Sequence, residues 1–412
     1  MLLLAVLAGA LPAGAQWPPP DQVLSEPRPA LLKMGPLDVH GRAVTSFVYD
    51  DNISLHERPK QEGIQTQEEV APLGADYVYT FTPGITFMKA ATLDDSHSSF
   101  RLDYSPSFVF FVRNSDQNSI DHSALLNAGY AWTKLTLGLG ANFADTSGAV
   151  VDVGDRVNQR NFSTALTARY ELSEKTFLLA DGSFNVTDYE DLNDSTEWKT
   201  TMTANYQISP KVTLGLGATY GQLDVFEEVL KAGSTNQTTR EKSLQRYVGP
   251  TVRASYRTTE KTDIALSVGG EWRVYADGDT RFAPVFALSG TYRPWEGTTF
   301  TVEGHQREQN SAVIAGANYT TTGASLSVRQ RLRERLFGTA SFTYDFSDYE
   351  PVEEGTEVDR QDDYFLLRCG LEVILGQSWS VGVFYQYRQD VSTDESYSFQ
   401  NNQVGIQAAW GY

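Results

Sequence analysis

The sequence contains one cysteine, and beyond residue 15 it has no apolar run long enough to form a membrane-spanning helix. Cys369 therefore has no intramolecular disulfide partner, and a cysteine-based metal site is excluded. The missing apolar runs exclude a helical membrane protein. They do not exclude a β-barrel, because barrel strands are apolar only at every second residue.

Positive charge is also scarce. Lys and Arg number 33 against 52 Asp and Glu, which gives a net charge of -19. An acidic chain is a poor general nucleic-acid binder, because the phosphate backbone must be neutralised by basic side chains. The nucleophile-elbow, zinc-protease and phosphate-loop motifs are absent, and the five histidines are scattered. We therefore expect no enzyme activity, no metal, no cofactor and no nucleic-acid partner.

The N-terminal residues read as an export signal. Residues 1–15 form an apolar segment that ends in the small-residue cleavage pattern Ala13-Gly14-Ala15. Residues 16–37 contain six prolines, which predicts a stiff periplasmic segment rather than a domain. The remaining residues, 38–412, are expected to form one domain.

Within 38–412 the apolar residues recur with a period of two. Phe100, Leu102 and Tyr104, for example, alternate with the polar Arg101 and Asp103. Such alternation predicts strands with one apolar and one polar face. The pattern predicts eighteen strands, near 38–50, 75–89, 98–113, 121–133, 135–145, 158–172, 176–188, 195–208, 212–224, 243–257, 262–275, 280–293, 298–309, 317–332, 336–347, 362–375, 378–389 and 399–412. The fold class is thus all-β: a transmembrane antiparallel up-and-down barrel of about 18 strands.

The connections alternate in length. Short ones, such as 133–134, 209–211 and 333–335, follow every second strand. The longer ones are 51–74, 145–157, 225–242, 348–361 and 390–398. Outer-membrane barrels have short periplasmic turns and longer external loops, so we expect the long connections outside the cell.

Aromatic residues concentrate near the strand ends, with aliphatic residues between them, which is typical of the two interfaces of an outer membrane. The last strand ends with Trp410 and Tyr412 in apolar alternation. This ending predicts a membrane-assembly signal read by the barrel-assembly machinery. Outer-membrane lipid and lipopolysaccharide are the other expected partners.

Arginines occupy many positions on the expected inward faces. The candidate lumen-lining residues for selectivity are Arg42, Arg101, Arg113, Arg169, Arg253, Arg273, Arg307, Arg329, Arg368 and Arg388. A lumen rich in guanidinium groups favours anionic solutes or a charged polymer. The alternative is that each arginine pairs with a carboxylate on a neighbouring strand. Three inward aromatics, Phe111, Phe337 and Phe384, are candidates either for stacking sugars or for packing against an inward loop.

Two short motifs resemble a known family. Tyr49-Asp50-Asp51-Asn52-Ile53 ends the first expected strand, and Thr82-Pro83-Gly84-Ile85 lies in the second. These elements resemble the beta-barrel porin 2 family of bacterial outer-membrane proteins, and the resemblance covers roughly 38–412. It implies an outer-membrane barrel, linked in some members to exopolysaccharide export with periplasmic export proteins. Taken alone, Asp50-Asp51-Asn52 fits either a divalent-cation site or a turn that caps the strand.

The expected function is translocation of solutes or polymer across the outer membrane of a Gram-negative cell. Three forms of it stay open: exopolysaccharide export, diffusion of small and preferentially anionic solutes, and a plugged structural or adhesive barrel without transport.

Overall fold

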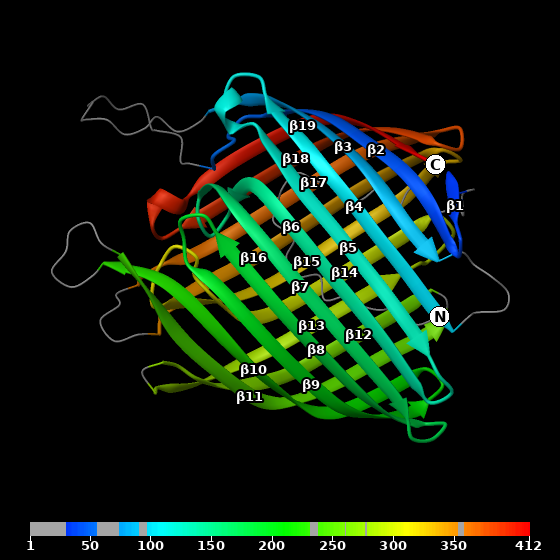
Figure 1. Ribbon diagram of the computed structural model, residues 1–412, viewed down its shortest axis with the longest axis vertical. Coiled ribbons are helices and arrows are strands. Elements are labelled where there is room, and N and C mark those ends of the chain that lie inside the picture. Colours follow the sequence, from blue (N-terminus) through cyan, green and yellow to red (C-terminus); the bar gives the residue numbers. More distant parts are fainter. Residues whose placement is uncertain are drawn as a thin grey trace.

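The computed structural model describes residues 30–55, 74–89, 97–230, 238–259, 261–276, 278–352 and 358–412. Its single sheet has 19 strands. From β2 to β19 each strand pairs antiparallel with the next along the chain, and β19 pairs with β2, so these strands close a barrel (Figure 1). The predicted antiparallel up-and-down barrel of 18 strands is confirmed.

The barrel strands are β2 (Leu37–Asp50), β3 (Asp76–Lys89), β4 (Ser98–Phe111), β5 (Ser119–Ala131), β6 (Leu135–Val150), β7 (Asp155–Glu171), β8 (Thr176–Tyr189), β9 (Asp194–Ser209), β10 (Val212–Leu230), β11 (Thr238–Thr259), β12 (Thr262–Val274), β13 (Thr280–Tyr292), β14 (Thr298–Asn310), β15 (Ala317–Arg333), β16 (Leu336–Pro351), β17 (Gln361–Leu375), β18 (Trp379–Ser392) and β19 (Phe399–Gly411). Within the described ranges, two short 3-10 helices lie in the connections, η2 (Ser115–Gln117) and η3 (Glu395–Tyr397).

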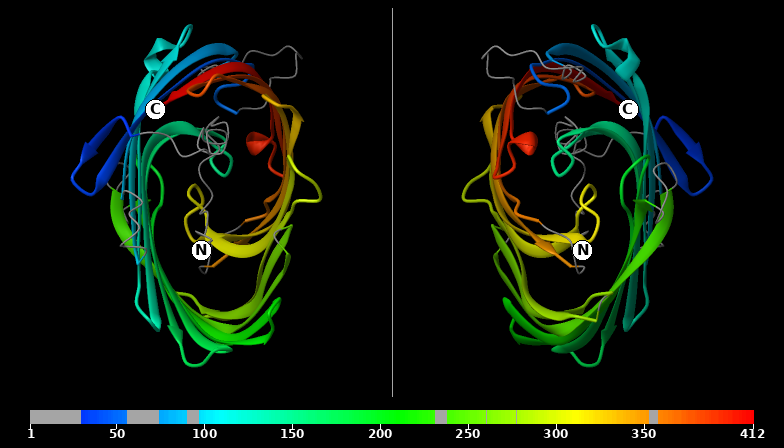
Figure 2. Two further views of the ribbon diagram at one scale, coloured as in Figure 1. Left: turned by 90° about the vertical axis from the view of Figure 1, so that its right-hand side faces the viewer. Right: turned by 90° about the vertical axis from the view of Figure 1, so that its left-hand side faces the viewer.

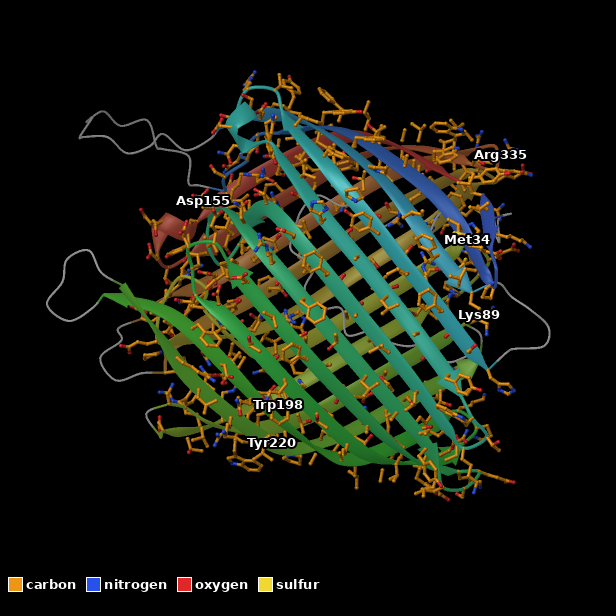
Figure 3. The ribbon with its side chains drawn as sticks, viewed as in Figure 1. Met34, Lys89, Asp155, Trp198, Tyr220 and Arg335 are labelled. Atoms are coloured by element: carbon orange, nitrogen blue, oxygen red, sulfur yellow. The ribbon has the colours of Figure 1, made fainter. Side chains whose placement is uncertain are left out.

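The apolar alternation forms the outer surface. Leu214 and Leu216 on β10, for example, are 43% and 67% exposed although both are leucines. Aromatic side chains pair near the strand ends: the rings of Trp198 and Tyr220 lie 5.3 Å apart on the outer face of β9 and β10 (Figure 3). Near the opposite end, the Tyr292 and Phe300 rings lie 6.5 Å apart. The outer surface thus has an aliphatic middle between aromatic ends.

The connections differ between the two ends of the barrel. At the end that carries β1 and the C-terminus, residues 132–134, 210–211 and 334–335 turn the chain in two or three residues. The opposite end carries longer connections such as 352–360 and 393–398. We call these the periplasmic and the external end, following the usual arrangement of such barrels.

Two predicted external loops consist mostly of strand. In the predicted loop 145–157, β6 continues to Val150 and β7 already begins at Asp155. In the predicted loop 225–242, β10 continues to Leu230 and β11 begins at Thr238. The alternation ends before these strands do. In water both faces of a hairpin can carry polar residues, so the sequence gives no period-two signal there while the backbone pairing continues.

The segment before the barrel is only partly described. Residues 1–29, which include the expected signal peptide and most of the proline-rich segment, lie outside the described residues. Leu32–Met34 form a short strand, β1, which turns at Gly35 (φ +61°) and pairs back with β2. β1 lies outside the ring of strands, where it covers the edge of β2 beyond the last residue of β19 (Figure 2). A strand here was not expected, because the prolines around it suggest irregular chain.

Candidate functional site: the inner wall and the hairpins folded against it

The inner wall is polar and keeps contact with solvent. Thr201 and Thr219 join their hydroxyls across β9 and β10 at 3.0 Å. Halfway along the barrel, the Arg253 and Asp181 side chains retain 29% and 26% exposure. A closed strand wall that is apolar outside and polar inside satisfies its backbone within lipid while holding water in its interior. The chain is an outer-membrane β-barrel.

The strand register places the following candidate arginines on the inner wall: Arg42, Arg101, Arg169, Arg253, Arg273, Arg307, Arg329, Arg368 and Arg388. Several have carboxylate partners. The Arg101 Nε–Asp103 Oδ2 distance is 2.6 Å, and Arg253 reaches Asp181 at 2.6 Å across the two strands between them. Others donate to neutral oxygens, as Arg307 does to Gln309 at 2.9 Å. On the inner wall, some guanidinium groups are therefore paired with carboxylates, and others are hydrogen-bonded to neutral oxygens.

Arg113 is a correction to the predicted set. It lies two residues beyond the end of β4, and its guanidinium is 5.8 Å from the centre of the Tyr77 ring, which faces the outside of the barrel. Strand alternation assigned Arg113 to the lumen, but alternation no longer determines side-chain direction once the strand has ended.

Three external connections turn into the barrel. The β6–β7 tip (151–154), the β14–β15 tip (311–316) and η3 lie inside the ring of strands in Figure 2, coloured teal, yellow and red. Each of the two hairpin tips turns through a glycine at positive φ, Gly154 (+69°) and Gly316 (+68°). A fourth segment, 51–55, also folds inward: Leu55 is fully buried against Tyr364.

The two hairpin tips meet at one carboxylate. Asp152, on the β6–β7 tip, accepts hydrogen bonds from the Ala312 backbone N–H at 2.9 Å and from the Tyr349 hydroxyl at 2.7 Å. Asn193, from the β8–β9 turn, donates its backbone N–H to the Ala312 carbonyl. We call Asp152, Ala312, Tyr349 and Arg360 the inner junction. It ties together segments that are far apart in the sequence.

Arg360 is the cation of the inner junction. Its guanidinium binds Asp362 through two nitrogens, with Nη2 2.7 Å from Oδ2, and donates to the backbone carbonyl of Asp152 at 3.1 Å. It also lies 4.3 Å and 3.5 Å from the ring centres of Tyr349 and Tyr397. Its side chain is only 3% exposed. A charge this deeply buried is retained only when it is paired, and here carboxylate and aromatic partners surround it.

Burial changes the acidity of the junction. It raises the pKa of the Asp152 carboxyl above its ordinary 3.8, against the hydrogen bonds from Tyr349 and Ala312 and the charge of Arg360. For Arg360 burial acts to lower the pKa, but the bond to Asp362 and neighbouring charges outweigh it, and the pKa is raised. Arg360 therefore stays charged, whereas Asp152 takes up a proton more readily than an exposed aspartate. Among the described residues no cluster of histidine, cysteine or acidic side chains is arranged to hold a metal ion.

The β14–β15 hairpin is also held against the neighbouring wall at β12. β14 pairs with β13 only up to Gln306, and beyond this point it leaves the wall. The Glu308 carboxylate then lies 3.4 Å from the Arg273 Nε and accepts a hydrogen bond from Tyr275 at 2.7 Å. Arg273, a predicted lumen residue, is thus buried under the hairpin, at 2% exposure, instead of facing solvent.

Each of the three inward aromatics lies beside an arginine, and two of them are buried. Arginine guanidinium groups lie 4.7 Å from the Phe111 ring centre, 4.7 Å from that of Phe337 and 5.0 Å from that of Phe384. Phe111 and Phe384 are 5% and 4% exposed. Of the two alternatives left open by the sequence, these contacts favour packing over sugar stacking.

Asp50-Asp51-Asn52 fastens the closing seam of the barrel. Asp50 accepts hydrogen bonds from the side chains of Asn401 and Gln403 on β19, and Asp51 accepts two from Asn402. These oxygens are therefore occupied by amide donors. The motif acts as the strand cap that was one of its two sequence-based interpretations.

The inner junction was not predicted from the sequence. Asp152 and Arg360 fell within expected external loops and belong to no motif. A signal was nevertheless present, because both tips are unusually apolar for solvated loops: 149–153 read Ala-Val-Val-Asp-Val and 312–315 read Ala-Val-Ile-Ala. Apolar hairpin tips indicate burial, although not what buries them.

No protein-family model matches the chain, and neither does any of the curated proteins. Among solved structures, it resembles OccAB3 of Acinetobacter baumannii with 10% identity and a TM-score of 0.43, covering 91% of this chain and 100% of that one. OpdQ of Pseudomonas aeruginosa has the same identity and TM-score, with 91% and 97% covered. The siderophore receptor PirA of Pseudomonas aeruginosa has 10% identity and a TM-score of 0.40, and the match covers 90% of this chain and 80% of that one.

Proposed function

We propose that the protein is a solute channel of the outer membrane, narrowed near its external end by the β6–β7 and β14–β15 hairpins. The observation that carries this proposal is the inner junction, where the hairpins meet at Asp152 inside a barrel with a polar, solvent-exposed wall. A barrel without transport would have no need of a hydrated wall along its length. Two hairpins pinned inside it restrict the size of what passes.

Small solutes fit this arrangement better than a polysaccharide chain. A polymer needs an uninterrupted path and gains from free aromatic faces, but Phe111 and Phe384 are buried under guanidinium groups. Polysaccharide export, which the resemblance to the beta-barrel porin 2 family implies, is the second candidate. It would require the inner junction to open when a periplasmic export partner binds.

Among small solutes, the wall favours anions. Arg307 donates to the neutral Gln309, and Arg329 lies over the Phe337 ring. Asp345 and Glu372 lie within electrostatic reach of these two arginines, but neither arginine is hydrogen-bonded to a carboxylate of the described wall residues. Their guanidinium N–H groups can therefore bind a carboxylate or phosphate in the lumen.

The test is single-channel conductance of the refolded barrel, from Gln16 onward, in a planar lipid bilayer. We expect steady conductance with anion selectivity, and an increase in conductance when the junction is broken by Asp152→Ala. Reversible block by added polysaccharide would instead favour polymer export. A folded barrel that stays silent, both as wild type and as Asp152→Ala, would contradict the channel and support a plugged structural barrel.

A further inference from the structure

The membrane-facing surface has a groove over β15 to β19. Its floor consists of Gly338, Ala340 and Cys369, which are small residues on neighbouring strands: Ala340 is paired with Cys369. Larger side chains, among them Leu371 and Tyr385, form its rim. The groove has a volume of 570 Å³, and its lining is almost wholly apolar. A run of small outward residues produces this depression, because no side chain fills the space above the floor.

The periplasmic end of the groove adjoins a basic turn. Gln330 lines the groove, and the next residues, Arg331 to Arg335, form the end of β15 and the β15–β16 turn, with three arginines and one glutamate. Leu332 extends from this turn to Gly338 on the groove floor. Arg333 and Arg335 are exposed, and within the described ranges neither has a carboxylate partner. Figure 3 shows Arg335 at the periplasmic rim.

We propose that this groove binds an anionic glycerophospholipid of the periplasmic leaflet. One acyl chain lies along the floor over Gly338, Ala340 and Cys369, and the phosphate lies between Arg333 and Arg335. The order of the parts matches such a lipid, with an apolar groove within the membrane and positive charge where the headgroups lie. Basic side chains beside membrane-embedded grooves recognise anionic headgroups in this way.

A second copy of the barrel fits the groove less well. The outer wall of a barrel is convex, so a neighbouring barrel would touch the rim and leave the floor uncovered. A flexible hydrocarbon chain can follow the floor and fill it, which gains the dispersion contacts that a void lacks. The inference is independent of what passes through the lumen.

The experiment is native mass spectrometry of the full barrel in detergent with added phosphatidylglycerol or phosphatidylcholine. The wild type should retain several-fold more phosphatidylglycerol. The double variant Arg333→Gln/Arg335→Gln should retain both lipids equally, since it removes the headgroup contact and leaves the groove intact. Ala340→Phe, which fills the floor, should lower retention of both.

The matched control is Thr200→Phe, which fills a smaller groove of 200 Å³ on the outer face of β6 to β9 and should leave the preference unchanged. Equal retention of the two lipids by the wild type, or a preference that survives in the double arginine variant, would overturn the proposal. Cys369 tests the rival occupant: efficient disulfide cross-linking of two barrels through Cys369 in membranes would assign the groove to a second copy.

Discussion

At the scale of single residues, Asp50 shows how a short motif can bind residues far away in the sequence. It is 7% exposed and accepts hydrogen bonds from the backbone N–H of Asn52 and from two β19 side chains, at 2.5 Å and 2.6 Å. Its partners come from the last strand, so the motif joins the first barrel strand to the last. Hydrogen bonds to a buried charged group are among the stronger ones in proteins.

Asp50→Ala should destabilise the barrel because it removes the charged acceptor of the Asn401 and Gln403 amides and leaves Asn401 only the Asn52 carbonyl. We expect a loss of roughly 1.5–3 kcal/mol for each such bond to a charged group. The measurement is the urea midpoint of the barrel in detergent micelles. Asp145→Ala is the control: it removes an exposed ion pair with Arg160 and should change the midpoint little. Equal effects of the two substitutions would contradict the role assigned to the seam.

Asp152 predicts a pH dependence of conductance. Burial in the docked junction raises its pKa above the ordinary 3.8, whereas an undocked tip would have the ordinary value. The docked form thus binds the proton more tightly. The stabilisation of docking by this proton is fully present below pH 3.8 and is lost as the pH rises through the raised pKa of Asp152. Conductance should therefore fall on acidification within this window, and the effect should disappear in Asp152→Asn.

A rise of conductance on acidification would also be informative, because charged neighbours act on Asp152. Arg360 and Asp362 both influence its titration. If conductance rises on acidification, the attraction between Asp152 and Arg360, and not burial, governs docking.

At the scale of strands and hairpins, the sequence predicts the wall well and the hairpin tips poorly. A wall strand such as β9 (Asp194–Ser209) carries polar residues toward the lumen, for example Thr201 and Asn205, and mostly apolar residues toward lipid, so its pattern is visible in the sequence. The β14–β15 tip is held instead by contacts to Asp152 and Asn193 in two other connections and to Glu227 near the end of β10. Such long-range contacts have no period, so a single sequence does not reveal them.

Shortening the β14–β15 tip tests its role as an element. Replacing 312–315 with two glycines removes the apolar residues that reach the inner junction, and we expect larger single-channel conductance with the barrel still folded. The matched control shortens the β4–β5 connection at η2, which has no buried residue and should leave conductance unchanged. If the two variants conduct alike, the tip does not narrow the channel.

At the scale of the whole molecule, an acidic chain has a wall with many arginines. The net charge of -19 is a sum over the whole chain, whereas a permeating ion interacts mainly with the charged side chains on the inner wall. The triple variant Arg307→Gln/Arg329→Gln/Arg368→Gln should shift reversal potentials toward cation preference. Arg113→Gln is the control, because this arginine lies outside the lumen. Unchanged selectivity of the triple variant would mean that carboxylates on the wall already balance the arginines.

The closing seam has a consequence for the connectivity of the chain. Gly41 and Tyr412 exchange backbone hydrogen bonds of 3.2 Å and 2.9 Å, so the start and the end of the barrel lie side by side at the same end. The strands therefore form a cycle in which the position of the chain break is arbitrary. A circular permutant that joins 412 to 38 by a short linker and opens the chain at Pro210, between β9 and β10, should keep every neighbour of the 18 barrel strands. In that permutant β19 and β2 would become neighbours in sequence, and the pairing of β9 with β10 would join the two ends of the chain.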